Sequence, residues 1–389
     1  MKIAALIHAI QAAQKQGKNV QFRLVHTGQH YDKNMSDTFF EELGIPAPDV
    51  NLGCGGGTQA EQTAAIMVAF EKELLAHPTD VVLVVGDVTS TMACSIVAKK
   101  LNTKVCHVEA GIRSWDLTMP EEINRMVTDS LADYMFTTSE VANRNLVRQG
   151  AELVEGLELS VERSSKVESG ESLPEDKYAF ERVPQKVWHV GNVMIDTLLA
   201  NRARFRKPEV WDELGLKEKE FVVMTMHRPA NVDEENHLRA MMEQIIDNVH
   251  GLPVIFPIHP RTAKILKELM SEGMNELTIE ERFPNLHIVE PLGYLEFNYL
   301  VERAKAVVTD SGGITEETTV MGVPCITLRD NTERPETCTV GTNELIGTKP
   351  EAIKPALDKL FAGEWKKGAI PELWDGHAAE RIIAILAEL

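Results

Sequence analysis

The chain has 389 residues, of which 43% are hydrophobic and 25% are charged, and its formal net charge is −19. This length favours two domains, and the acidic balance argues against sequence-independent nucleic-acid binding, which needs a basic surface. No apolar run is long enough to span a membrane, no signal peptide is visible, and the five cysteines are scattered. We therefore expect no membrane partner, reduced thiols and a cytoplasmic location.

Strand-like β-branched runs alternate with helical patterns along nearly the whole chain. Expected strands fall into a first set at 20–26, 81–86, 104–109, 134–138 and 187–190, and a second set at 221–226, 253–257, 286–290, 306–310 and 324–328. Expected helices include 59–75, 89–101, 120–133, 236–249 and 314–321. Continuous apolar strands separated by helices indicate parallel sheets covered on both faces. The pattern predicts an α/β protein with two doubly wound domains and a ligand crevice at the strands' carboxyl ends.

The domain limits follow from the two sets of strands. We expect an N-terminal domain at 1–200 with an exposed polar insertion at 152–186, and a C-terminal domain at 201–370. The segment 371–389 contains a final helix, predicted at 376–389, that can pack back on the first domain. Lys2 to Ile10 reads as a helix with no strand before it, whereas a doubly wound domain is expected to open with a strand.

The most informative segment is DSGGITEE at 310–317, which follows an expected strand. A Ser-Gly-Gly turn that opens a helix aims backbone N–H groups and the positive end of the helix dipole at an anion. Its glycines let the backbone approach a phosphate closely. Glu317 lies one turn into the helix, where its carboxylate can accept hydrogen bonds from a ribose diol. The segment indicates a nucleotide-diphosphate site, and the alternative is an ordinary turn with Glu317 on a solvated face.

Acidic residues follow expected strands of the first half. Asp87 is either a site residue or the N-cap of the next helix. Glu109 ends an unusually apolar strand, and its alternative role is an ion pair with Arg113. Glu121 follows Thr118 at the spacing of a capping box. If these carboxylates converge, they push one another's pKa values apart, which supplies a proton acceptor and a proton donor.

Basic residues follow strands of the second half. His227 and Arg228 follow one strand, His259 and Arg261 follow the next, and Arg334 lies further along the chain. Such pairs suit a phosphate or a developing leaving-group charge. The sequence contains no DxD or HExxH motif and no convincing metal-ligand spacing, so we expect neither a metal nor another cofactor.

Together these segments resemble the bacterial UDP-N-acetylglucosamine 2-epimerases. The matching stretches are TGQHYD at 27–32, GDVTST at 86–91, HVEAGIRS at 107–114, MPEEINR at 119–125, GNVMIDTL at 191–198, HRPAN at 227–231, DSGGITEE at 310–317 and TERPE at 332–336. They occur in the family's order and cover nearly the whole chain. The resemblance implies a GT-B fold, in which two Rossmann-like domains enclose the active site in the cleft between them.

The resemblance also implies an activity. A non-hydrolysing isomerase of this kind interconverts UDP-N-acetylglucosamine and UDP-N-acetylmannosamine by eliminating UDP to a glycal and adding it back. A homodimer that serves surface-polysaccharide biosynthesis is what the resemblance suggests. The alternatives are an epimerase of another UDP-2-acetamido sugar, a hydrolysing 2-epimerase, a GT-B glycosyltransferase, and a nucleotide-sugar-binding protein without catalysis.

The matching motifs carry over site residues. Asp87, Glu109 and Glu121 look like the catalytic acids, with the C2 base left open among them, and His227 looks like a diphosphate or leaving-group contact. The implied substrate-binding residues are Lys2, Arg113, Leu292 and Phe297 (the last two at the uracil), Ser311, Gly312 and Gly313 (at the diphosphate), Glu317 (at the ribose) and Arg334.

The chain departs from the family pattern in three places. The family's opening strand and its Arg, which precede the Lys matched by Lys2, are absent, so we expect poor activity. Gln29 and His30 match part of a second, regulatory UDP-N-acetylglucosamine site, but the Arg-Gln pair of that site falls in Gly-Gly-Gly at 55–57. We therefore predict weak or no activation by substrate. The usual acid after the His-Arg pair is replaced at 229–230.

Overall fold

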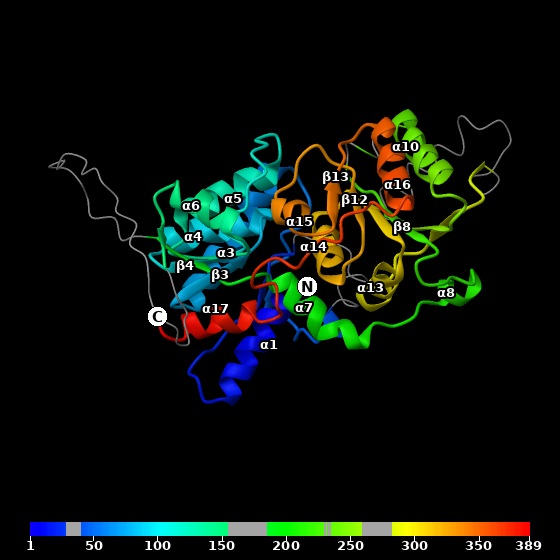
Figure 1. Cartoon of the computed structure of the whole chain (residues 1–389). Coiled ribbons are helices and arrows are strands. Elements are labelled where there is room, and N and C mark those ends of the chain that lie inside the picture. The colour runs from blue at the N-terminus through cyan, green and yellow to red at the C-terminus, as the bar shows by residue number, and fades with distance from the viewer. Residues whose placement is uncertain (29–39, 155–184, 229–230, 232–234, 259–281) are drawn as a thin grey trace, which may run out of the picture.

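The computed structural model describes residues 1–28, 40–154, 185–228, 231, 235–258 and 282–389. Within these residues the strands form three sheets, and every strand pairing is parallel. The elements of the two halves of the chain gather in two lobes (Figure 1). This confirms the α/β class with two doubly wound units.

The first lobe is built on a five-stranded sheet. Its strands, in spatial order, are β3 (Val81–Val85), β4 (Lys104–Val108), β5 (Tyr134–Thr137), β7 (Lys186–His189) and β6 (Glu152–Leu153). The helices of this half are α1 (Lys2–Lys15), α3 (Gln59–Ala76), α4 (Thr89–Lys100), α5 (Pro120–Leu131), α6 (Glu140–Val147) and α7 (Val193–Asn201). A separate pair consists of β1 (Val25–His26) and β2 (Val50–Asn51). The expected strand at 20–26 is therefore wrong for its first five residues.

The second lobe is built on a six-stranded sheet in the order β10-β9-β8-β11-β12-β13. Its strands are β8 (Val222–Thr225), β9 (Val254–Pro257), β10 (Leu286–Val289), β11 (Ala306–Thr309), β12 (Cys325–Thr327) and β13 (Asn343–Leu345). Counted from β8, this is the 3-2-1-4-5-6 order of a dinucleotide-binding sheet, and the order reverses between β8 and β11. Ligands of such sheets bind at this reversal, outside the carboxyl ends of the strands.

Short helices connect and cover the second sheet. They are η1 (Arg202–Arg204), α8 (Glu209–Glu213), α10 (Glu235–Asn248), α13 (Tyr294–Arg303), α14 (Gly312–Met321), α15 (Pro335–Thr339), η2 (Pro350–Ala352) and α16 (Ile353–Phe361). Apolar side chains fill both faces of the sheet: α10 and α16 pack on one face, whereas the apolar side chains of α13 pack on the other. Burial on both faces explains why these strands are continuous apolar runs instead of alternating ones.

The last helix, α17 (Ala378–Leu386), packs on the first lobe beside α1 and α7 (Figure 1). Ile382 and Ile383 join the apolar cluster that contains Phe136 of β5 and Trp188 of β7. The carboxylate of Asp196 on α7 accepts hydrogen bonds from the backbone N–H groups of the first turn of α17, at 3.1 and 2.6 Å. Because α7 also contacts α14 of the second lobe, it links the two lobes.

The predicted insertion at 152–186 has ends that belong to the first sheet. Glu152 and Leu153 form β6, and Lys186 opens β7, with which β6 pairs. Glu152 and Leu153 are exposed, as expected, but both ends of the predicted insertion are strands and not loop. Residues 155–184 lie outside the described residues.

Candidate active site

The candidate residues gather at the carboxyl ends of the two sheets. Asp87 and Glu109 come just after β3 and β4, which are neighbours in the first sheet. His227 and Asp310 come just after β8 and β11, the two strands at which the strand order of the second sheet reverses. The topology therefore brings acids of one lobe and a His-Asp pair of the other to positions suited to ligand binding.

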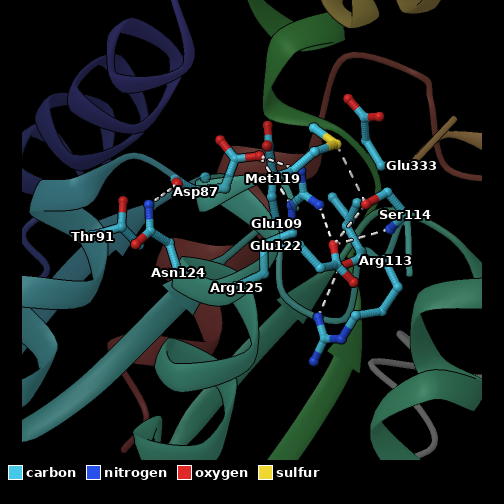
Figure 2. A network of polar contacts seen from close by, with 12 residues as sticks. Asp87, Thr91, Glu109, Arg113, Ser114, Met119, Glu122, Asn124, Arg125 and Glu333 are labelled. Atoms are coloured by element: carbon cyan, nitrogen blue, oxygen red, sulfur yellow. Dashed lines mark hydrogen bonds and ion pairs between the residues drawn. The ribbon is translucent and has the colours of Figure 1, made fainter. Parts of the chain in front are cut away.

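Asp87 is held by an arginine and does not cap a helix. The N-cap of α4 is Val88, so the N-cap alternative is wrong. The Oδ2 atom of Asp87 lies 3.0 Å from both Nε and Nη2 of Arg125. Figure 2 shows this contact, together with the ion pair between Arg125 and the buried Glu122. Asn124 donates to the backbone carbonyl of Asp87 at 2.9 Å, so α5 positions this acid through two adjacent residues.

Glu121 is exposed in the first turn of α5, and the capping box predicted for it is wrong. The N-cap is Met119, without a side-chain cap. The Thr118 hydroxyl instead donates to Asp116 Oδ1 at 2.6 Å. Burial lowers the pKa of Arg228 in the second lobe, and the charge of Glu121 is one of those that oppose this.

Glu109 lies at the centre of a buried charged cluster. Its backbone has φ 70°, in the left-handed region that residues other than glycine rarely adopt and that recurs at functional sites. Its Oε2 atom is 2.6 Å from Lys2 Nζ and 3.0 Å from Arg334 Nη2. Burial alone would raise the pKa of Glu109, but these two cations outweigh burial and lower it. Its Oε1 atom is buried and accepts no hydrogen bond within the described part of the chain.

Arg334 connects the two lobes in this cluster. It approaches Glu109 and donates to the Thr138 hydroxyl at 3.3 Å, both from the first lobe. It also forms an ion pair through Nε with Glu316 on α14, in the second lobe. Burial raises the pKa of Glu316 to about 7, although the Arg334 charge opposes this. Lys2, Glu109, Arg334 and Glu316 thus form one continuous cluster across the two lobes.

Arg113 is buried beneath the site and pairs with a residue other than Glu109. Its Nη1 atom lies 2.6 Å from Asp129 Oδ2, so the alternative reading of Glu109 as the ion-pair partner of Arg113 is wrong. His107 contacts the other oxygen of Asp129 through Nδ1 at 2.6 Å and the Gly86 carbonyl through Nε2 at 2.8 Å. This arrangement ties the loop after β3 to the loop after β4, and so holds Asp87 and Glu109 on a common base.

The Ser-Gly-Gly turn opens α14, as the sequence predicts. Ser311 is the N-cap residue, and its side chain makes no capping hydrogen bond. A Cβ added to Gly312 would lie 2.9 Å from Glu333 Oε1, and one added to Gly313 would lie 2.9 Å from Met194 Cε. Glu333 itself pairs with Arg329 at 2.5 Å. Side chains crowd the turn closely enough that only glycine fits without a shift.

Asp310 anchors the His227 loop to this turn. Its carboxylate accepts hydrogen bonds from the backbone N–H groups of His227 (3.0 Å) and Arg228 (2.9 Å) and from Asn231 Nδ2 (3.0 Å). Its Oδ1 atom also lies 2.8 Å from His227 Nδ1. A carboxylate is an acceptor, so the hydrogen of this contact belongs to the imidazole. Asp310 therefore fixes the orientation of the His227 ring.

Glu317 is buried on α14 and contacts the preceding helix, α13. Its Oε1 atom accepts a hydrogen bond from the Tyr294 hydroxyl at 2.9 Å. Burial raises the pKa of Glu317 to about 7, against the effect of that hydrogen bond. Leu292 and Phe297, predicted at the uracil, are half-buried against the apolar cluster on the α13 face of the sheet. All four residues thus lie on α13, on α14 or just before α13.

Several candidates cannot be placed. Gln29, His30, His259, Arg261 and residues 229–230 lie outside the described residues. Within the ranges that the structure does describe, no group of His, Cys, Asp and Glu is arranged to hold a metal ion, and no helix is long and apolar enough to cross a membrane. The five cysteines are all free thiols.

Sequence reasoning missed three residues that the structure brings into the site. Asp310 and Glu316 stand in the DSGGITEE segment, but the motif predicts a role for neither of them, and no motif contains Tyr294. The available signal was an acidic residue at the end of a buried strand for Asp310, and a second carboxylate beside Glu317 for Glu316. Their partners lie far away in sequence, so the roles follow only from the fold.

The protein has two doubly wound lobes. Carboxylates lie at the strand ends of the first lobe, and a glycine turn lies where the strand order of the second lobe reverses. These features define a GT-B-type α/β protein. The model of the family described as UDP-N-acetylglucosamine 2-epimerase matches residues 12–387, and the chain belongs to this family. A curated UDP-N-acetylglucosamine 2-epimerase from Methanocaldococcus jannaschii is 37% identical, over 99% of this chain and 95% of the relative. Because this relative is archaeal, the resemblance is not confined to bacteria.

The chain is also similar to an epimerase named for another sugar and to a solved structure. A Pseudomonas aeruginosa protein named UDP-2,3-diacetamido-2,3-dideoxy-D-glucuronate 2-epimerase is 35% identical, over 94% of this chain and 91% of the relative. The crystal structure of Methanocaldococcus jannaschii UDP-GlcNAc 2-epimerase in complex with UDP-GlcNAc and UDP has a TM-score of 0.79 at 36% identity. It covers 100% of this chain and 96% of that chain. The GT-B fold predicted from the motifs is confirmed.

Proposed function

We propose that this protein is a non-hydrolysing UDP-N-acetylglucosamine 2-epimerase, which interconverts UDP-N-acetylglucosamine and UDP-N-acetylmannosamine. The observation that carries the proposal is the Lys2–Glu109–Arg334 cluster. It sets a buried carboxylate of one lobe against a cation of the other, at the ends of both sheets. Family membership and the names of the relatives support the same activity.

The chemistry requires two kinds of group. A C2 proton of a sugar is poorly acidic, so its removal must be coupled to departure of a stable UDP anion. The C2–H bond breaks toward a carboxylate, the C1–O bond breaks with its electron pair leaving on UDP, and a C1–C2 double bond forms. Return of a proton to the opposite face of C2, with re-addition of UDP at C1, gives the epimer. Proton-transfer groups at the sugar and an anion site at the diphosphate are both needed.

The described residues supply both. We assign Glu109 to proton transfer at C2, because one of its oxygens is held by two cations while the other makes no hydrogen bond within the described chain. Asp87 and Glu121 are the other candidates for the acids, with Asp87 held by Arg125.

The diphosphate and the nucleoside are assigned to the second lobe. Gly312 and Gly313 at the start of α14 offer backbone N–H groups to the diphosphate, and Ser311 is assigned to it through its hydroxyl, because the Ser311 N–H donates to the Thr309 hydroxyl at 3.0 Å. We assign His227, whose ring is oriented by Asp310, to the departing UDP. The remaining assignments are Glu317 at the ribose, Leu292 and Phe297 at the uracil, and Lys2, Arg113 and Arg334 as further substrate contacts, although Arg113 acts through Asp129 in this structure.

A second candidate is epimerisation of a UDP-diacetamido uronic acid. The 35% identity to the Pseudomonas aeruginosa relative, close to the value for the Methanocaldococcus jannaschii relative, favours keeping it. The domain limits at 1–200 and 201–370, the homodimer, the cytoplasmic location and weak substrate activation remain predictions. Gel filtration with light scattering tests the dimer.

Product analysis tests the proposal. The chain is incubated with UDP-N-acetylglucosamine, and nucleotides and free sugars are separated and identified by NMR. We expect UDP-N-acetylmannosamine, and we expect Glu109→Gln, Asp87→Asn and Glu121→Gln each to slow its formation by about 100-fold or more. Free N-acetylmannosamine with UDP would assign the hydrolysing reaction instead. Turnover of only a diacetamido uronic acid substrate would favour the second candidate.

A further inference from the structure

Arg334 is shared between two buried carboxylates, and only one of them has a role in the reaction proposed above. Glu109 lies on one side of the guanidinium, 3.0 Å from Nη2, and Glu316 forms an ion pair with Nε on the other. The side chains of Glu109 and Glu316 are 2% and 1% exposed. Water therefore screens neither contact, and each carboxylate is sensitive to the charge of the other.

The cluster is balanced only when both carboxylates are ionised. Lys2 and Arg334 carry two positive charges, and Glu109 and Glu316 then carry two negative ones. If Glu316 is neutral, Arg334 has Glu109 as its remaining partner in this cluster, and the cluster keeps one net positive charge. Two cations then stabilise the ionised form of Glu109 alone, which makes Glu109 a weaker base.

The groups that face Glu316 place its titration near neutral pH. Burial raises its pKa to about 7; Arg334 and Lys2 lower it, and the charges of Glu109 and Glu336 raise it. Glu316 is thus mainly neutral below about pH 7 and mainly ionised above it. The fraction of Glu316 that is negatively charged, and so shares Arg334 with Glu109, therefore rises as the pH increases through 7.

We infer that Glu316 is a positioning residue for proton transfer: by sharing Arg334 with Glu109, it keeps the Glu109 carboxylate basic enough to accept a proton from the sugar. This inference rests on the proposed function, because it concerns the base of that reaction. Glu316 itself acts through Arg334. Removing its charge strengthens the hold of Arg334 on Glu109 and slows the proton transfer.

The adjacent residue provides a matched control. Glu317 stands on the same helix, is buried, and has its pKa raised by burial to about 7, but its carboxylate contacts the Tyr294 hydroxyl and not Arg334. Glu317→Gln therefore tests loss of a buried charge on α14 without changing the partner of Arg334. Because Glu317 is assigned to the ribose, its substitution is expected to raise KM.

The experiment compares kcat and KM for UDP-N-acetylglucosamine in the wild type, Glu316→Gln and Glu317→Gln between pH 5.5 and 9. Circular dichroism and calorimetric UDP binding check that each variant folds. The wild-type kcat is expected to rise with pH through about 7. Glu316→Gln is expected to lose about tenfold or more in kcat at pH 8, with KM within about threefold, and to lose the rise in kcat near pH 7, because Gln stays neutral at every pH. Glu317→Gln is expected to keep the rise near pH 7 and to raise KM.

Three results would overturn the inference. The first is a wild-type kcat that does not change through pH 7. This result requires no variant protein, and it would exclude titration of Glu316 as a control of the rate. A folded Glu316→Gln protein with unchanged kcat, or with kcat and KM altered as in Glu317→Gln, would reduce Glu316 to a structural residue. A wild-type chain without turnover of any UDP-sugar would remove the proposed function and this role together. The first two results, in a protein that does turn over the UDP-sugar, remove only the role.

Discussion

Asp310→Asn tests whether one buried carboxylate holds the His227 loop against the turn that opens α14. The Asp310 side chain is fully buried and has four contacts: two backbone N–H groups, the Asn231 amide and the His227 ring, at 2.8 to 3.0 Å. Asn keeps the shape but offers one acceptor oxygen and turns an NH₂ group toward the remaining donors. Hydrogen bonds to a charged group contribute about 1.5–3 kcal/mol each, and coupled losses do not add fully. We expect the variant to lose about 2–4 kcal/mol of unfolding free energy at pH 7.

The pH dependence of that loss is a further part of the prediction. Burial alone would raise the pKa of Asp310, but the contacts with His227, the Arg228 N–H and Asn231 outweigh burial and lower it. A carboxylate whose pKa is lower in the folded state contributes stability above its unfolded pKa of about 3.9. That contribution is lost as pH falls through the folded value. The gap between wild type and Asp310→Asn should therefore be widest above about pH 5 and narrow below about pH 4.

Urea denaturation followed by circular dichroism at several pH values measures the gap. The control is Asp358→Asn, which removes an exposed pair with Lys354 one turn away on α16 and should cost at most about 0.5 kcal/mol. The same preparations should show a loss of kcat in Asp310→Asn, because the His227 ring loses its fixed orientation. Equal stability of Asp310→Asn and wild type at pH 7, or a gap that widens as pH falls, would refute the reasoning.

Three other outcomes are expected. Gly312→Ala places a Cβ 2.9 Å from Glu333 Oε1. Steady-state kinetics should then show a KM for the UDP-sugar raised about tenfold, with kcat little changed. An unchanged KM would argue against diphosphate binding at this turn. His107→Ala leaves the buried Asp129 with one partner fewer and should lower the unfolding free energy, measured by urea denaturation, by about 3–5 kcal/mol. A urea midpoint equal to that of the wild type would show that the His107–Asp129 contact is not needed for stability. Initial rates should depend hyperbolically on substrate; sigmoidal rates that Gln29→Ala abolishes would reveal the regulatory site that we predict to be weak or absent.

Much of the fold could be predicted because local sequence patterns specify its helices and strands. Helices such as α3 and α4 and strands such as β9 and β11 lie within two residues of their expected limits, since long periodic or continuous apolar runs specify them. Strands β2, β6 and β13 have two or three residues, too few to show a pattern. The segment Val-Gln-Phe-Arg-Leu at 20–24 does not become a strand, because residues of high β-propensity form a ladder only where a neighbouring strand pairs with them.

The candidate site, too, could be predicted only in part. The acids Asp87 and Glu109 could be placed at one sheet edge because parallel strands end on the same side. The partners of these acids could not be predicted, since Glu109 meets Arg334 225 residues further along the chain. Local spacing also misled: Thr118 caps no helix, because the nearer Asp116 takes its hydroxyl. Proximity in sequence suggested Arg113 as the partner of Glu109, whereas the fold gives Arg113 a different carboxylate.

Proton NMR of UDP-N-acetylglucosamine with this protein in deuterated water, without added metal, tests C2 epimerisation by C2–H cleavage most directly. The proposed reaction predicts UDP-N-acetylmannosamine carrying deuterium at C2, and gradual loss of the C2 proton signal from the substrate pool as the reaction reverses. A new UDP-sugar that keeps its C2 proton, or UDP-N-acetylglucosamine that neither exchanges nor converts, would contradict it.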